Sequence, residues 1–357
     1  MIHKVTLDPP DLRAARAEFA GGRSYLAACT VGLPTHRTRT AVIDDLDAAA
    51  TGQVTAREYT ATVERTRGHF ARLVGVEPTR VAIGSQASVF AGLIAGSVPD
   101  GAEVLCVEGD FSSMVLPFVH AGRGIRLRTA PLDDIADAIS ADTWLVAFSL
   151  VQSATGEVAD ASAIRAAAAR HGTRTLCDAT QAVGWLPVDA RDYDAVICHA
   201  YKWLCAPRGV AFLAISEDFA RGIRPIFAGW YAGGDPWVSC YGHDVELAED
   251  ATRFDVSPAW QAFVGAEPAI GLFASLDAAA LYEHATGLAA EFRTGRGIPR
   301  PERASAIVAW RDTGGSDLAR LTDAGIVASG RAGHTRVAFH VFNDPHDVTS
   351  ALMALGA

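Results

Sequence analysis

A carboxylate and an amine follow two short apolar segments near the middle of the chain. Asp178 comes directly after the segment 175–177, and Lys202 stands shortly after the segment 195–198. Both segments have the length and composition of buried strands, and ligands of open α/β sheets bind just beyond the carboxyl ends of such strands. We therefore expect both side chains to reach one crevice. A lysine and an aspartate placed there suit pyridoxal phosphate (PLP), whose aldehyde bonds to the amine while its protonated pyridine nitrogen pairs with the carboxylate.

Each of these two residues also has an ordinary structural explanation. Lys202 could be a solvated surface lysine, and Asp178 could cap the N-terminus of a helix. The neighbours of Lys202 are the aromatic residues Tyr201 and Trp203, and this setting argues against simple exposure to solvent. The cofactor site is therefore the favoured interpretation.

Three stretches of the sequence resemble the class V aminotransferase superfamily: Asp178–Gln181, Tyr201–Lys202 and Ala206–Val210. That superfamily belongs to fold type I of the PLP enzymes, and its members include cysteine desulfurases, kynureninases and isopenicillin N epimerase. The similarity runs from about Tyr25 to the C-terminus. The combination of stretches is specific, whereas any one of them alone would be a weak signal.

The resemblance implies an α/β fold with two domains. The larger domain, residues 18–260, is expected to bind PLP on a mostly parallel seven-stranded sheet, and residues 1–17 with 261–357 are expected to form a smaller α+β domain. Apolar runs predict the strands, at residues 81–83, 103–107, 125–127, 144–149, 175–177, 195–198, 210–215, 306–310 and 335–342. Helical patterns cover residues 9–20, 36–74 with a break near Gly52, and 161–170.

Composition and charge argue against several partners and compartments. The chain has 357 residues, is 50% hydrophobic and carries a net charge of -10 without a run of basic residues, so nucleic acid and anionic membranes are not expected partners. Its six cysteines show no C-x-x-C spacing, no metal-ligand set stands out, and the first twenty residues lack an apolar signal region. We therefore expect a cytoplasmic protein that acts on a small molecule.

A strand-to-helix turn follows the segment 81–83 and reads Gly84-Ser85-Gln86-Ala87. The N-terminus of a helix offers unpaired N–H groups and a positive dipole to an anion. Relatives place a comparable pair of residues at this point. We therefore assign this turn to the PLP phosphate, with Ser85 and Gln86 acting through their side chains and Ala87 through its N–H group.

The resemblance implies further contacts with the cofactor ring. Phe111 is expected to stack on the pyridine face, at a position where cysteine desulfurases carry His and kynureninases carry Phe. Ser153, or its neighbour Gln152, falls where relatives place a donor to the phenolic oxygen of PLP. Gln181 is expected to hydrogen-bond the same oxygen or the lysine–cofactor link.

The resemblance also implies contacts with the phosphate from residues far along the chain. His199 and Tyr201 are expected to reach it, although His199 could equally be a satisfied polar residue at a strand end. Ser257 corresponds to a hydroxyl that reaches the phosphate bound by the partner subunit in desulfurases. An obligate homodimer with shared active sites is therefore expected.

Arg336 occupies the position of the family arginine that binds the α-carboxylate of an amino-acid substrate. A guanidinium suits this role because its planar donors match both oxygens of a carboxylate, and the alternative is an arginine on the surface of a strand. The N-terminal segment often touches substrate in the family, so Ala28 and Cys29 are candidates to line the pocket. A packed edge segment explains these two residues equally well.

The expected chemistry begins with a Cα proton removed by Lys202, kept neutral by burial and nearby positive charge. Desulfurases need a mobile cysteine shortly before the arginine strand, and the segment 330–335 contains none. Together with Phe111 and Tyr201, this absence favours a lyase that cleaves a bond at Cβ, for example in an S-linked cysteine conjugate. Transamination is the close alternative and amino-acid epimerisation the third. A catalytically idle scaffold protein is a further, disfavoured possibility.

Overall fold

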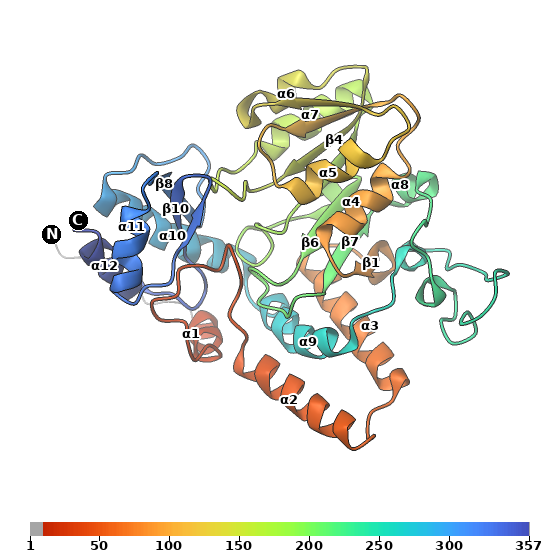
Figure 1. Cartoon of the computed structure of the whole chain (residues 1–357), viewed down its shortest axis with the longest axis horizontal. Coiled ribbons are helices and arrows are strands. Elements are labelled where there is room, and N and C mark those ends of the chain that lie inside the picture. Colours follow the sequence, from red (N-terminus) through yellow and green to blue (C-terminus); the bar gives the residue numbers. More distant parts are fainter. Residues whose placement is uncertain (1–9, 357) are drawn as a thin grey trace.

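The structure is a computed structural model that describes residues 10–356, and these residues form two β-sheets. The order in the large sheet is β1 (Val81–Gly84), β7 (Ala211–Ile215), β6 (Ala195–His199), β5 (Arg174–Asp178), β4 (Thr143–Ser149), β2 (Glu103–Val107) and β3 (Arg126–Ala130). The order in the small sheet is β8 (Ile307–Arg311), β10 (His334–Ala338) and β9 (Ser329–Arg331). Figure 1 shows the small sheet beside the large one.

One strand of the large sheet, β7, runs opposite to the other six. The strands from β3 across to β6 are parallel, whereas β7 and the edge strand β1 pair antiparallel. The predicted fold class, a mostly parallel seven-stranded sheet with a smaller C-terminal α+β part, is confirmed. The α-helices are α1 Pro10–Ala17, α2 His36–Ala50, α3 Ala56–Leu73, α4 Ala87–Ala95, α5 Ser112–His120, α6 Ile135–Ala138, α7 Ala161–His171, α8 Glu217–Gly222, α9 Trp260–Ala274, α10 Ala278–Arg296, α11 Ser316–Asp323 and α12 Pro345–Ala354.

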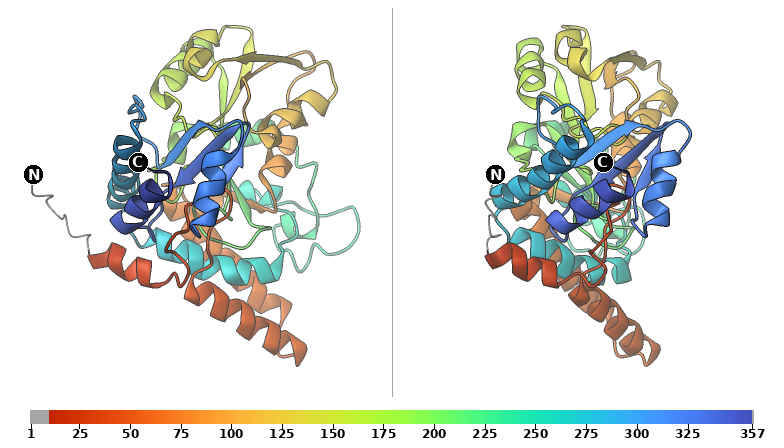
Figure 2. Two further views of the ribbon diagram at one scale, coloured as in Figure 1. Left: turned by 60° about the vertical axis from the view of Figure 1, so that its left-hand side comes forward. Right: turned by 90° about the vertical axis from the view of Figure 1, so that its left-hand side faces the viewer.

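Helices cover both faces of the large sheet, because its strands are apolar on both faces. Successive side chains alternate between the faces. Val104 and Leu213 pack with residues of α4, α5 and α8, whereas Leu105 and Phe212 pack with residues of α3, α7 and α9. The views in Figure 2 show α2 extending away from the body at the lower end, where it packs against α9.

The segment 25–34 connects the small sheet with the loop that carries Lys202. Leu26 is bound to the small sheet and to the residues just before it by two backbone hydrogen bonds. Its N–H donates to the carbonyl of Val327, and its carbonyl accepts from the N–H of Ala338, each at 2.8 Å. A few residues later, the N–H of Gly32 donates to the carbonyl of Tyr201 at 2.8 Å. The segment therefore passes directly between β10 and the predicted active site.

The strand predicted over 335–342 is too long, because β10 ends at Ala338. A tight turn follows, in which Asn343 N donates to the carbonyl of His340 at 3.0 Å and Asn343 Oδ1 accepts from His340 N at 2.9 Å. Phe339 still packs with Val337, whereas Val341 and Phe342 pack with Ala338, so the alternation of side chains that is typical of a strand ends at this turn. Strand β9 was not predicted, because its three residues include Gly330 and Arg331 and no large apolar side chain.

The division into residues 18–260 and residues 1–17 with 261–357 stays a prediction. Residues 1–9 of the predicted smaller domain lie outside the described part of the chain. Among residues 10–356, no single helix has the length and apolar character to cross a membrane, and the pair α9 and α10 passes that test only jointly, with a 90° bend between them.

Candidate active site

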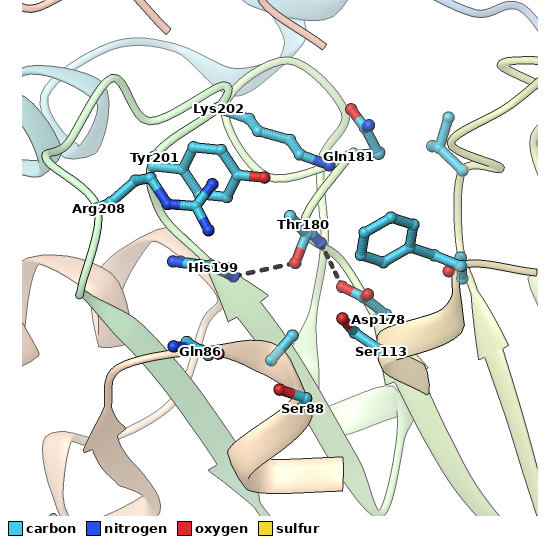
Figure 3. A pocket seen from close by; sticks show the side chains of 14 residues that line it. Gln86, Ser88, Ser113, Asp178, Thr180, Gln181, His199, Tyr201, Lys202 and Arg208 are labelled. Atoms are coloured by element: carbon cyan, nitrogen blue, oxygen red, sulfur yellow. Dashed lines mark hydrogen bonds between the residues drawn. The ribbon is translucent and has the colours of Figure 1, made fainter. Parts of the chain in front are cut away.

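The carboxyl ends of β4, β5 and β6 meet at one edge of the large sheet. Ser149 ends β4, Asp178 ends β5 and His199 ends β6, and Ser149 pairs in register with Asp178. These ends open into a pocket, seen from close by in Figure 3. It is lined by Gln86, Ala87, Ser88, Phe111, Ser113, Ser149, Val151, Asp178, Thr180, Gln181, His199, Tyr201, Lys202 and Arg208.

Asp178 lines this pocket and is buried. Burial raises the pKa of its carboxyl group, whereas hydrogen bonds from Thr180 and the charge of Lys202 lower it. The backbone N–H of Thr180 donates to Oδ1 at 2.8 Å. Among the described residues only Thr180 hydrogen-bonds this carboxylate, which has about four acceptor positions, so it can accept a further N–H donor from a bound ring.

Lys202 lies in the loop after β6 and is 5% exposed. Burial lowers the pKa of its amine to about 8, although Asp178 raises it. The Nζ atom stands 5.4 Å from the centroid of the Phe111 ring. Its neutral form is therefore accessible near neutral pH, as a nucleophile or base requires. Apart from Lys4, it is the only lysine in the sequence.

One end of the pocket is suited to an anion. The buried Nε2 atom of His199 has no hydrogen-bond partner among the described residues, and burial lowers the pKa of this imidazole to about 4, so it stays neutral. The ring of His199 contacts that of Tyr201 edge-on, with centroids 4.4 Å apart, and the Arg208 guanidinium lies 4.5 Å from the Tyr201 centroid.

The turn from β1 into α4 lies at the same end of the pocket. Gln86 is the N-cap of α4 and its side chain makes no capping hydrogen bond. The N–H of Ala87 has no acceptor among the described residues. Unpaired N–H groups at a helix N-terminus, an orphaned imidazole nitrogen and a nearby guanidinium form a donor set for a phosphate group.

Gln181 uses its whole amide group to join three segments. Its Nε2 donates to the carbonyl of Cys29 at 2.9 Å and to Ser153 Oγ at 3.2 Å. Its Oε1 accepts from Trp203 Nε1 at 2.8 Å. Both amide hydrogens are therefore engaged, and a contact from this amide to a cofactor requires one of these bonds to be exchanged.

Arg336 lies next to this network and is 1% exposed. Its Nη1 donates to the carbonyl of Ser153, its Nη2 donates to Thr30 Oγ1 at 3.2 Å, and Nε and Nη2 donate to Ser329 Oγ at 3.3 and 3.2 Å. None of these acceptors is charged, and burial lowers the pKa of the guanidinium. A buried cation among neutral acceptors is prepared for an anionic ligand.

The pocket brings together most of the residues predicted from the sequence. Eight of them line it: Gln86, Ala87, Phe111, Asp178, Gln181, His199, Tyr201 and Lys202. The others do not line it. Ser153, Cys29 and Arg336 lie behind Gln181, Ala28 is buried, Ser85 directly precedes the lining residue Gln86, and Ser257 is exposed after the 3₁₀ turn Ala251–Phe254.

Sequence reasoning missed six lining residues: Ser88, Ser113, Ser149, Val151, Thr180 and Arg208. Two of them stand inside stretches that carry the family resemblance, Thr180 beside Asp178 and Arg208 in the stretch 206–210. Ser149 ends an apolar strand, so the rule that identified Asp178 applies to it too. No comparable signal distinguishes Ser88 and Ser113, which lie in the first turns of α4 and α5.

Comparison with known proteins agrees with this geometry. The family model described as aminotransferase class-V matches residues 45–295. An uncharacterized aminotransferase of Bacillus subtilis, YcbU, is 24% identical and the match covers 94% of each chain. Isopenicillin N epimerase of Streptomyces clavuligerus is 29% identical over 74% of each chain. The structure of the cystine C-S lyase C-DES superposes with a TM-score of 0.83 at 20% identity, covering 94% of this chain and 97% of that one.

The residues of the pocket fit the cofactor of that family. A buried amine and a buried carboxylate stand at neighbouring strand ends, and unpaired donors for a phosphate lie at the other end of the pocket. The family match covers more than half of the sequence. The chain therefore belongs to the class V aminotransferase family, whose cofactor is pyridoxal 5′-phosphate.

Proposed function

We propose that this protein is a PLP-dependent lyase that cleaves a bond at Cβ of an α-amino acid, and that S-linked cysteine conjugates are its substrate class. One observation carries the proposal: the amine of Lys202, whose pKa burial lowers to about 8, lies over the ring of Phe111, which has no proton to transfer. Lys202 is therefore the base that we propose for the proton at Cα. A single base suffices for elimination, whereas epimerisation by two bases needs a second proton donor on the opposite face.

PLP, when bound, supplies an electron sink for negative charge at Cα. The protein's own residues then have separate tasks. Asp178 would hold a proton on the pyridine nitrogen, because a buried carboxylate stabilises the positive charge. Lys202 accepts the Cα proton and can return it to the departing sulfur. For a cysteine conjugate the products are a free thiol, pyruvate and ammonia, after water has been taken up.

Arg336 is proposed to bind the α-carboxylate of the substrate. Its present acceptors are the carbonyl of Ser153 and the hydroxyls of Thr30 and Ser329, all of them neutral. A carboxylate would give this buried guanidinium an ionic partner with bidentate geometry. Ala28 and Cys29 lie on the segment that leads to Thr30, so any contact they make with substrate would be next to the carboxylate.

The phosphate is proposed to bind between the turn 85–87 and the pair His199 and Tyr201. Unpaired donors on both sides of the pocket support this assignment. Ser257 is exposed in a single chain. We propose that it completes the site of a second copy, so that the active enzyme is a homodimer.

Transamination is the second candidate, and a specific observation favours it. The aminotransferase of Bacillus subtilis aligns with nearly the whole chain, whereas the epimerase aligns with three quarters of it. Transamination would use the same base and the same carboxylate site. The likeness to the C-S lyase structure supports the lyase through the fold alone, because the identity is 20%.

The products formed from S-benzyl-L-cysteine and L-cystine test the proposal. The lyase releases pyruvate and ammonia without any added 2-oxo acid. A transaminase instead yields a 2-oxo acid that retains the sulfur substituent, and only when an acceptor such as 2-oxoglutarate is present. Appearance of the D-enantiomer without pyruvate would assign an epimerase. The Lys202→Ala protein serves as the control and should form none of these products.

A further inference from the structure

The edge strand β1 turns one row of backbone groups away from the sheet. It pairs antiparallel with β7 only, as Figure 1 shows. In such a pair, alternate residues point their N–H and C=O groups to the partner strand. The groups of Val81 and Ile83 point outward, to where a further strand would lie.

Two charged side chains and one backbone group occupy that place. Arg67 of α3 donates from Nη1 to the carbonyl of Val81 at 2.6 Å. Asp255 accepts the N–H of Ile83 on its Oδ1 at 2.7 Å. The N–H of Val256 donates to the carbonyl of Ile83 at 3.2 Å. The N–H of Val81 donates to the carbonyl of Pro78, so each outward group of β1 named above has a partner.

Arg67 and Asp255 form a bidentate ion pair. Their Nη1–Oδ1 and Nη2–Oδ2 distances are 3.1 and 2.7 Å, and each residue is 1% exposed. Glu64 contacts Arg67 from the solvent side, with Nη2–Oε1 at 2.9 Å, and its side chain is 50% exposed. Removing one member of a buried pair leaves an uncompensated charge, so the geometry of β1 depends on both members.

The end of β1 leads directly into the turn that lines the cofactor pocket. Ile83 is followed by Gly84, where a Cβ atom would lie 2.7 Å from the ring of Phe90. The ring of Phe90 in α4 therefore packs closely against the backbone where β1 ends. Only Gly84 and Ser85 separate Ile83 from Gln86, so we expect a shift of Ile83 to move the turn.

We propose that the Arg67–Asp255 pair is a positioning device for the phosphate-binding turn 85–87. Neither residue of the pair is among those that line the pocket, and both contact the backbone of β1. This inference rests on the proposed phosphate role of that turn, and it is independent of the choice between lyase and transaminase. It predicts that the pair controls how strongly the protein prefers PLP over pyridoxal, which lacks the phosphate.

The test measures the Kd of the full-length apoprotein for PLP and for pyridoxal. The quantity compared among variants is the ratio of the Kd for PLP to the Kd for pyridoxal, which rises when the preference for PLP is lost. Asp255→Asn keeps an acceptor for Ile83 N but removes the ionic partner of Arg67. We expect its Kd for PLP to rise about tenfold, as for one lost charge-assisted hydrogen bond, while its Kd for pyridoxal changes less than about threefold. Glu64→Gln is the matched control and should leave the ratio unchanged, because Glu64 does not touch β1.

An unchanged ratio would overturn the proposal. If both Kd values rise by the same factor, the pair supports the fold in general, and if neither Kd changes, the pair has no effect on the turn. Should Asp255→Asn not fold, Arg67→Lys decides in the same way. It keeps a cation, but one ammonium cannot replace the fork that holds Asp255 and Val81 together.

A further variant separates this inference from the phosphate assignment itself. Ala87→Pro removes one N–H group at the first position of α4, where proline is well tolerated. The preceding Gln86 already has the extended backbone, φ -156° and ψ 152°, that a residue before proline prefers. A raised ratio of the Kd for PLP to the Kd for pyridoxal in Ala87→Pro, with an unchanged ratio in Asp255→Asn, would leave the phosphate site standing and refute the positioning role.

Discussion

Replacing Arg336 by methionine should weaken substrate binding without disturbing the cofactor. The substitution keeps much of the length of the side chain and removes its charge. In the structure the guanidinium has neutral acceptors only, at 3.2 to 3.3 Å for the three hydrogen bonds from Nε and Nη2. A substrate carboxylate would thus add a charge-assisted bidentate pair, which is worth about 2–3 kcal/mol.

That energy corresponds to an increase in KM of about 10²-fold. The assay follows pyruvate release from S-benzyl-L-cysteine as a function of its concentration, with PLP saturating. Arg331→Met is the matched control: this exposed arginine of β9 lowers the pKa of Arg336 through its charge, but its own Nη1 donates to the carbonyl of Gly330. We expect KM to change little in the control.

A second substrate makes the prediction specific to the carboxylate. In S-benzyl-L-cysteinamide the α-carboxylate is replaced by a neutral amide, so the wild-type protein and Arg336→Met should bind it about equally. An unchanged KM for the acid, or the same loss for acid and amide, would refute the assignment of Arg336 as the carboxylate site.

Two further predictions concern the loop around Lys202. Burial lowers the pKa of this amine to about 8, and only the neutral amine bonds to an aldehyde. The rate of cofactor uptake by the apoprotein should therefore rise about tenfold per pH unit below pH 8 and level off above it. A rate that still climbs steeply between pH 9 and 10.5 would contradict the lowered pKa. Gly32→Ala places a Cβ atom 2.0 Å from the carbonyl of Lys202, whereas a Cβ at Gly21 meets nothing within 4 Å. Overpacking of this kind costs about 1–3 kcal/mol, so thermal unfolding should show a lower midpoint for Gly32→Ala than for Gly21→Ala, and equal midpoints would refute the close approach.

The placement of Asp178 and Lys202 could be predicted because it depends on local pattern. Each follows an apolar run, and the ends of parallel strands meet at one edge of a sheet. The same rule covers Ser149, which was overlooked because a serine at a strand end is chemically unremarkable. The predicted order of strands and helices succeeded for the same reason, since continuous apolar runs indicate strands buried on both faces.

Contacts between distant segments could not be read from the sequence. Gln181 contacts Cys29 and Ser153, and Arg336 contacts Ser153 and Thr30, so these contacts join the loops after β4 and β5 with the segment 25–34 and with β10. Nothing local to these residues specifies such pairs.

The pair Arg67 and Asp255 shows the same limit. In the sequence Arg67 is one of several charged residues at helical spacing, which normally mark a solvated face. Its burial follows from the position of α3 beside the open edge of β1, a long-range feature. The early end of β10 has a similar cause, because His340 and Asn343 form a turn whose hydrogen bonds outweigh the β propensity of Phe339, Val341 and Phe342.

The covalent attachment point of the cofactor tests the central claim most directly. Apart from the N-terminus, the chain offers only the amines of Lys4 and Lys202. Borohydride reduction of the PLP-loaded protein, followed by peptide mass mapping, would fix the cofactor to the amine that holds it. We predict a reduced adduct on Lys202, present in a Lys4→Arg control and absent from Lys202→Ala. An adduct on Lys4 or the N-terminus alone, or none in the loaded protein, would contradict the account.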